Sequence, residues 1–452
     1  MFTVGRGPSG MGVLSGAGVS IRVAGEALAL TFRDRSLRRA QAAFAIVWAG
    51  EWAVLVALGV VAFDAGGPAA VGLVAALRML PGALLAPLAA TVADAVRRER
   101  VLAAIGVIRA ATLSAAGAVL ALDGPVAATF GLVTLATVAQ TLYRPAHSAL
   151  LPALCTGPRE LTSANVVRGL LDSFATLSGP LAAAVVLETS GPALVFVACG
   201  SCSLLASLLL LDLHYQAGPP PDRPPLGGLA VLDGFRAISA DRDLRLVTGL
   251  TTVQTFTRGA FSVLAVVVAI ELLETGPAGV GILNGAVGAG AIVGSLGALM
   301  LVRHGRLAAW LGAGVALWGL PLATIAAVPD ELGAVALLVA VGTGNALVDV
   351  GAFTLPARLV DDRVLARVFA GFEGILTLGV AAGAAVAPVA IQLLGIRGAL
   401  VAIGAVGPLA VLATWSALGR LDLRIRAREA DAPQLRRPPA RRVPDGLAVS
   451  EA

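Results

Sequence analysis

Charged residues are scarce in this sequence, and their scarcity limits what the chain can be. Only 13% of the 452 residues are charged, whereas 57% are hydrophobic and the mean hydropathy is +0.88. A soluble domain carries about 25% charged residues, so an ordinary water-soluble fold is excluded. Only helices and closed barrels satisfy every backbone polar group in lipid, and barrel strands would alternate in segments of about ten residues. The long unalternated runs here predict an all-α membrane protein.

Lysine is missing, and all 33 basic residues are arginine. Codon usage explains this bias without a functional cause. The isoelectric point near 10 would suit a nucleic-acid partner. The arginines lie mostly between apolar runs, however, where the preference of basic residues for the cytoplasmic side of a membrane accounts for them. We therefore expect no nucleic-acid partner. Aromatic residues make up only 4% of the chain, which argues against a large aromatic binding cage.

The residues that metal sites and enzymes need are also sparse. Cys199 and Cys202 form a C-x-x-C inside an apolar run, without a second pair or a nearby histidine, so small packed side chains are expected rather than a metal or redox site. The third cysteine is Cys155. No G-x-x-x-x-G-K-[ST] loop is present, which argues against ATP hydrolysis. The histidines lack metal-ligand spacing: His147, His214 and His304. We expect no metal, no cofactor and no enzymatic activity.

Twelve apolar runs fill most of the chain, each near the ~20 residues that cross a bilayer. They lie at about 41–62, 69–93, 101–122, 126–146, 163–187, 191–212, 245–270, 277–301, 307–327, 332–355, 365–392 and 396–418. A polar, proline-rich segment separates the first six from the last six, as a semi-rigid spacer would. We expect a disordered segment at 1–32 and a six-helix bundle at 33–213. A cytoplasmic linker at 214–244 leads to a second six-helix bundle at 245–418, and a disordered Arg/Pro-rich cytoplasmic tail follows at 419–452.

The charges in the loops alternate along the chain and fix an expected orientation. One set of loops carries arginines: Arg97, Arg98, Arg100, Arg159, Arg223, Arg236, Arg242, Arg245, Arg303, Arg306, Arg358 and Arg363. The other set carries acids, with Arg397 as the one basic exception: Asp64, Asp123, Glu188, Glu271, Glu274, Asp330 and Glu331. Arginine-rich loops stay in the cytoplasm, so twelve spans with both termini cytoplasmic fit best. We therefore expect a monomeric, multi-pass protein of the cell membrane.

The two halves also resemble each other in sequence. Asp172-Ser-Phe-Ala-Thr-Leu177 in span 5 aligns with Glu373-Gly-Ile-Leu-Thr-Leu378 in span 11. Parallel six-span halves with a central site between them are a transporter architecture.

The turn between spans 2 and 3 resembles the signature of the major facilitator superfamily, G-x-L-A-D-R-x-G-R-R. Residues 90–99 read A-T-V-A-D-A-V-R-R-E, so that Asp94 and Arg98 match, whereas Ala90, Ala95 and Arg97 depart from it. The resemblance implies that Asp94 and Arg98 form a cytoplasmic gate that helps to set the outward-facing state.

Further motifs resemble the multidrug, macrolide and siderophore exporters of that superfamily. Tyr143-Arg144-Pro145-Ala146, Glu160-Leu161 and Ser163-Ala164-Asn165 have the spacing of that branch. Gly179-Pro180 resembles part of its antiporter motif, where small residues permit close helix contact and proline permits a bend. The resemblance implies proton-coupled export of a small molecule such as a drug, antibiotic or siderophore-like metabolite. Uptake of a metabolite by symport is the alternative, and a membrane-anchored sensor or scaffold fits less well.

Ionisable residues inside the spans each cost ~2.5–3.5 kcal/mol and therefore need a partner or a function. Glu51 and Arg78 both fall near mid-membrane, where they can pair. The other candidates for proton coupling in a central cavity are Arg109, Asp172, Arg258 and Glu373. One acid exchanging a proton for substrate is the functional interpretation, and static ion pairs that orient helices are the alternative, which we favour for Asp349. Arg144 is expected to be structural. Side chains expected to line the substrate cavity are Trp48, Trp52, Gln140, Gln254, Asn284 and Asn345.

Overall fold

A computed structural model describes residues 33–95, 97–211, 213, 228–301, 306–327, 330–360 and 362–431, and in this part the chain is helical throughout. The helices of the first half are α2 (Arg35–Ala95), α3 (Arg98–Ala121), α4 (Val126–Thr141), α5 (Tyr143–Leu154), α6 (Pro158–Ser190) and α7 (Pro192–Leu210). Those of the second half are α8 (Gly228–Ala240), α9 (Arg242–Val267) with the π-helix η1 (Val268–Leu272), α10 (Gly276–Leu301), α11 (Leu307–Ile325), α12 (Glu331–Leu359) and α13 (Asp362–Asp431).

Ten helical segments in the described residues are long and apolar enough to cross a membrane, in agreement with the expected multi-pass protein. Two elements are too long for one crossing: α2 has 61 residues and α13 has 70. Each is interrupted at a glycine in the left-handed region, Gly67 with φ 61° and Gly395 with φ 70°, where side chains with a Cβ are disfavoured. Each of these elements therefore consists of two helical segments joined at a glycine.

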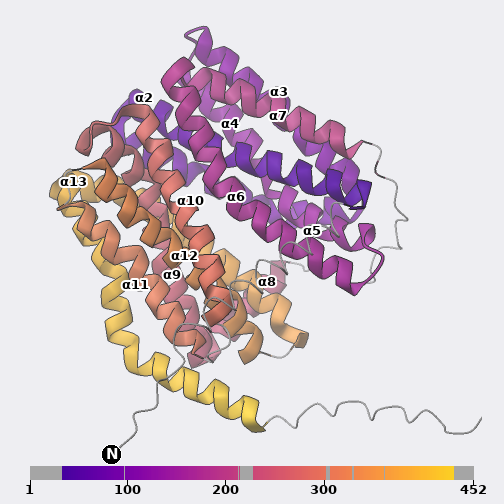
Figure 1. Cartoon of the computed structure of the whole chain (residues 1–452), viewed down its shortest axis with the longest axis vertical. Coiled ribbons are helices and arrows are strands. Elements are labelled where there is room, and N and C mark those ends of the chain that lie inside the picture. Colours follow the sequence, from indigo (N-terminus) through magenta and orange to yellow (C-terminus); the bar gives the residue numbers. More distant parts are fainter. Residues whose placement is uncertain are drawn as a thin grey trace, which may run out of the picture.

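The helices form two bundles that meet along α6 and α10, as Figure 1 shows at the boundary between the magenta and orange ribbons. One end of the molecule carries the turns that contain Asp123, Glu188, Glu274 and Asp330, and we name it the acidic end. The opposite end carries the turns with Arg97, Arg242, Arg306 and Arg358, and we name it the arginine end.

The halves touch closely on the acidic side of the middle and separate toward the arginine end. A methyl group added at Gly288 of α10 would lie 2.6 Å from the Cα of Leu177 in α6. A methyl at Gly72 of α2 would lie 2.7 Å from the carbonyl oxygen of Ala384 in α13. Nearer the arginine end, Gly169 of α6 and Gly297 of α10 have no atom within 4 Å of such a methyl. The close glycine contacts between the halves therefore lie on the acidic side of the middle.

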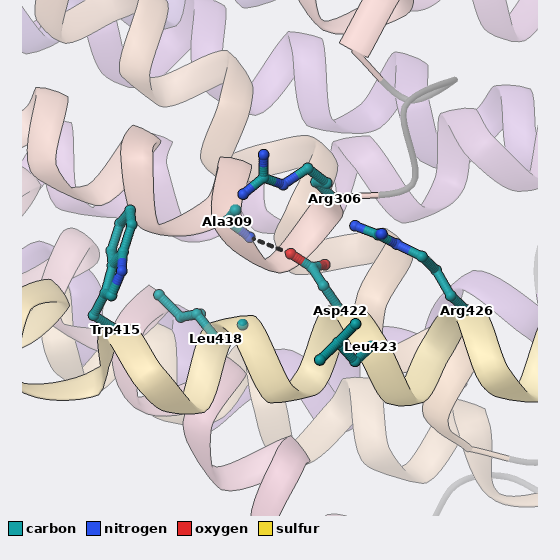
Figure 2. A pocket seen from close by; sticks show the side chains of 8 residues that line it. Arg306, Ala309, Trp415, Leu418, Asp422, Leu423 and Arg426 are labelled. Atoms are coloured by element: carbon teal, nitrogen blue, oxygen red, sulfur yellow. Dashed lines mark hydrogen bonds between the residues drawn. The ribbon is translucent and has the colours of Figure 1, made fainter.

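The chain beyond residue 418 corrects one expectation. The tail 419–452 is predicted to be disordered, but α13 continues to Asp431, with Leu421, Asp422 and Ile425 at most 6% exposed. Asp422 Oδ1 accepts a hydrogen bond from the Ala308 amide at 2.9 Å. Its Oδ2 accepts one from the Ala309 amide at 3.1 Å, which Figure 2 shows as a dashed line. The prediction is wrong for 419–431, because this segment buries one face against the bundle and its Asp422 caps the start of α11. Residues 1–32 and 432–452 lie outside the described part.

The segment expected as a linker, 214–244, is also partly helical. Helix α8 occupies Gly228–Ala240 and packs against α13, where Gly234 meets the backbone of Arg367. The proline-rich residues before it are not among those described. The second bundle therefore begins earlier than residue 245.

Candidate functional site

Three ionisable side chains meet inside the first half, and we name them the buried triad: Glu51, Arg78 and Arg109. Arg109 of α3 donates from Nη1 to Glu51 Oε2 at 2.8 Å and to the carbonyl of Ala136 at 3.4 Å. Arg78 Nη2 lies 3.6 Å from Glu51 Oε1. Glu51 and Arg78 are each 8% exposed and Arg109 is 1% exposed. With one carboxylate and two guanidinium groups, the triad carries a formal charge of +1.

Five charged side chains near the separated ends of the bundles form a second group, the facing charges: Arg144, Asp172, Arg258, Asp349 and Glu373. Arg144 Nη2 lies 3.0 Å from Asp172 Oδ2, and its guanidinium stands 5.2 Å from the ring centroid of Trp48, so Arg144 is not merely a packed helix-end residue. Arg258, Asp349 and Glu373 of the second half are exposed. Arg144 and Asp172 of the first half act electrostatically on Asp349 across the two bundles. Carboxylates and guanidinium groups thus confront one another where the halves separate.

A polar chain on the second half leads to one of these acids. Gln254 of α9 donates to Asn345 Oδ1 of α12 at 3.4 Å, and Asn345 donates to Asp349 Oδ2 at 2.9 Å. Among the described residues Asp349 has no ion pair within 4 Å, so the static pair that the sequence suggests for it is not what the structure shows.

The motif residues occupy two regions. The side chain of Asp94 lies outside the described part, whereas Arg98 donates from Nη1 to the Ala149 carbonyl at 2.9 Å and so joins α3 to α5. Gly179 packs on Ala49 and Trp52 within the first bundle, because a methyl there would lie 2.8 Å from the Trp52 Cβ. The carbonyl of Pro180 faces Gly281 of α10 across the bundles. Gly179 therefore belongs to the packing of the first bundle, and Pro180 to the contact between the halves.

The remaining predicted cavity residues are dispersed. Gln140 is 6% exposed, and its side-chain amide makes no hydrogen bond within the described part of the chain. Asn284 donates to the Val280 carbonyl of its own helix at 2.8 Å. Cys199 is buried, Cys202 is exposed, and all three cysteines are free thiols.

The sequence interpretation missed a buried aromatic column beside the triad. Phe44 of α2 stacks on His147 of α5 at 4.6 Å between centroids and lies 6.5 Å from Tyr143, and both Tyr143 and His147 are fully buried. The sequence does contain a signal for this column. Gln140, Tyr143 and His147 are spaced three and four residues apart and therefore share one helix face.

Comparison with known proteins assigns the fold and the family. A family model described as "Transmembrane secretion effector", of the major facilitator superfamily, matches residues 31–443. A crystal structure of the nucleoside transporter NupG superposes with a TM-score of 0.71 at 14% identity and covers 86% of this chain and 100% of its own.

Two other solved structures share the fold. A bacterial homologue of the human lysosomal transporter Spinster, in an inward-facing and unoccupied conformation, has a TM-score of 0.65 at 14% identity and covers 85% and 97% of the two chains. A POT family transporter in complex with a thioalcohol-conjugated peptide has a TM-score of 0.63 at 13% identity and covers 85% and 96%. No curated protein matches the chain in sequence.

The chain therefore belongs to the major facilitator superfamily, in the family described as transmembrane secretion effectors. It is a multi-pass membrane transporter of that type, as the sequence resemblance predicts, and the family is one of transporters rather than enzymes.

Proposed function

We propose that the protein is a secondary active transporter that exports a small molecule from the cytoplasm in exchange for protons. The observation that carries the proposal is the set of facing charges, which lies where two otherwise apolar bundles separate. Ionisable groups are expensive in a membrane, and an opening that admits water is where they are tolerated and where a polar cargo is recognised.

The proposed topology has twelve spans with the arginine end in the cytoplasm of a cell membrane. The glycine breaks in α2 and α13 divide each element into two segments, which brings the ten long helices to twelve crossings. Arginine-bearing turns at one end support the orientation through the positive-inside rule. The separation of the bundles at that end then corresponds to an inward-open state.

Alternating access requires the contact at the acidic end to be releasable. Small residues form this contact, and Gly281, Gly285 and Gly288 of α10 meet α6 between Leu177 and Ala184. Small residues permit close helix approach without interlocking side chains, which suits surfaces that part and rejoin. Rocking about the centre would close the arginine end and bring the facing charges together.

Two observations support export over uptake. The matching family is described as secretion effectors, and Tyr143-Arg144-Pro145-Ala146 resembles exporter motifs. The structural likeness to a nucleoside transporter supports uptake of a polar metabolite as the second candidate, although at 14% identity it establishes only a common fold.

For proton coupling we propose two carboxylates, Glu51 in the buried triad and Glu373 among the facing charges. Each proton that crosses a potential of 100 mV supplies ~2.3 kcal/mol, enough to drive a modest substrate gradient. Glu51→Gln and Glu373→Gln are expected to abolish uncoupler-sensitive transport in protein that still folds. Normal transport in both variants would remove these acids from the mechanism.

The direct test is accumulation of a panel of antibiotics and dyes in cells with and without the protein, each with and without an uncoupler. Export predicts lower accumulation of at least one compound, reversed by the uncoupler. Higher accumulation would favour uptake by symport, and unchanged accumulation of every compound would contradict transport of these classes.

A further inference from the structure

Buried polar atoms without a protein partner gather in one part of the first half. Within the described residues, those beside the triad and the aromatic column are Gln41 Oε1, Trp48 Nε1, Arg78 Nε, Arg109 Nε and Nη2, Thr129 Oγ1, Gln140 Oε1 and Nε2, Tyr143 Oη, and His147 Nδ1 and Nε2. In the described second half, the corresponding atoms are the Nε1 of Trp310 and Trp318. Leaving a buried polar group unpaired costs about 1–3 kcal/mol, so a non-protein hydrogen-bond partner at these atoms would stabilise the fold.

The atoms lie along two facing helices rather than at random. On α2, Gln41, Phe44, Trp48 and Glu51 follow one another at spacings of three and four residues and so share a face. On α4 and α5, Gln140, Tyr143 and His147 do the same. Ring contacts between Phe44 and both Tyr143 and His147 show that the two faces are apposed.

Contacts of this set extend from the triad toward the arginine end. Arg109 bonds to Glu51 and to the Ala136 carbonyl, and its charge acts on the Tyr143 hydroxyl. The Tyr143 and His147 rings are 6.4 Å apart.

The far end of the alignment reaches α6. His147 approaches the backbone of Ala40 without a well-formed hydrogen bond, and the charge of Arg168 acts on it. Gln41 donates to the Ala164 carbonyl of α6 at 2.8 Å. Ten helical residues separate Glu51 from Gln41, which corresponds to about 15 Å, or half of the hydrocarbon thickness.

The charge of the triad leads to the same conclusion. Two guanidinium groups face one carboxylate, which leaves one positive charge in excess, and two of the three Arg109 nitrogens are unpaired at 1% exposure. An excess positive charge in a dry interior is strongly unfavourable unless it is solvated or paired.

We infer that a file of internal water molecules runs through the first half, from the Glu51–Arg109 pair past Gln140 and Tyr143 to His147 and the arginine end. Buried waters typically make about three hydrogen bonds to otherwise unpaired polar groups, and these residues supply such groups at every helical turn. Resting on the proposed function, the file would give Glu51 a proton route to the cytoplasm that is separate from the opening through which cargo passes.

Hydroxyl-radical footprinting of the purified full-length protein tests the file without any cargo. Radiolysis generates radicals from water in place, so side chains beside internal water are oxidised although they are buried. After correction for intrinsic reactivity, Tyr143 and His147 are expected to be oxidised at least about ten-fold faster than Phe196 and Phe372, which are equally buried. Oxidation of Tyr143 and His147 as slow as that of the two phenylalanines would overturn the inference.

A substitution sharpens the test. Gln140→Leu keeps the approximate volume and removes two of the polar atoms, so oxidation of Tyr143 and His147 is expected to fall several-fold while that of Phe196 stays unchanged. Unchanged oxidation of Tyr143 and His147 in a folded Gln140→Leu protein would also contradict the file. Neither readout involves transport, so failure here leaves the proposed export standing, and failure of export leaves the file standing.

Discussion

The two halves share a fold but place their ionisable residues differently. The first half buries Glu51, Arg78 and Arg109 together inside its bundle. In the described second half, Arg258, Asp349 and Glu373 are exposed, and the buried acid Asp422 serves as a helix cap at the arginine end. The comparison teaches that the pseudo-symmetry of the helices does not extend to charge. Both halves contribute to the facing charges, but among the described residues only the first half also holds a cluster of paired charges buried within its bundle.

The largest expected effect comes from breaking the buried triad. Arg109→Met leaves Glu51 with Arg78 alone at 3.6 Å, and removing one partner of a buried pair costs about 3–5 kcal/mol. We expect the unfolding temperature in detergent to fall sharply, as measured by loss of the monodisperse gel-filtration peak after heating. The double variant Glu51→Gln/Arg109→Met leaves Arg78 as a lone buried charge and should be no more stable than Arg109→Met, which keeps the Glu51–Arg78 pair. A single variant as stable as wild type would show that the triad is not a structural unit.

Substitution of the exposed acids of the second half should leave stability nearly unchanged and abolish transport. Asp349→Asn keeps an acceptor for the Asn345 amide, so its effect on stability is expected to stay within about 0.5 kcal/mol. Glu373→Gln is the matched exposed substitution. We expect both to retain the wild-type unfolding temperature and to lose uncoupler-sensitive transport. Destabilisation of either variant comparable to that of Arg109→Met would erase the distinction between the halves.

A smaller effect is expected where the second half buries an acid for structure alone. Asp422→Ala removes the acceptor of two amide protons at the start of α11 and should cost about 0.5–2 kcal/mol. Asp422→Asn retains one acceptor and should lose less. Thermal unfolding checks the order of the two, and equal stability of Asp422→Ala and wild type would mean that the cap contributes nothing.

The sequence predicts the membrane class, the helical runs and the family, because apolar length and motif spacing are local properties. It also places Glu51 and Arg78 at similar depth. It does not predict the bond from Arg109 to Glu51, because the spans are apolar on all sides and their pattern does not reveal which face of α3 turns inward.

The tail shows a different limit. Its arginines and prolines indicate disorder, yet the stripe formed by Leu418, Leu421, Asp422 and Ile425 packs against the bundle. That packing depends on α11, more than a hundred residues earlier in the chain, so composition alone could not show it. The same holds for the facing charges, whose grouping arises from the angle between the bundles.

The most direct test of the central claim is the distance between spin labels at Val166→Cys and Ala357→Cys, one on each half toward the arginine end, in protein whose native cysteines are replaced. Double electron–electron resonance would measure this distance in the protein with its native Gly288 and in the Gly288→Leu variant. The leucine side chain cannot fit beside Leu177. If the halves rock about the centre, wedging the acidic side apart should shift the label distance to shorter values. A folded Gly288→Leu protein with an unchanged distance distribution would contradict alternating access by rocking of these two bundles.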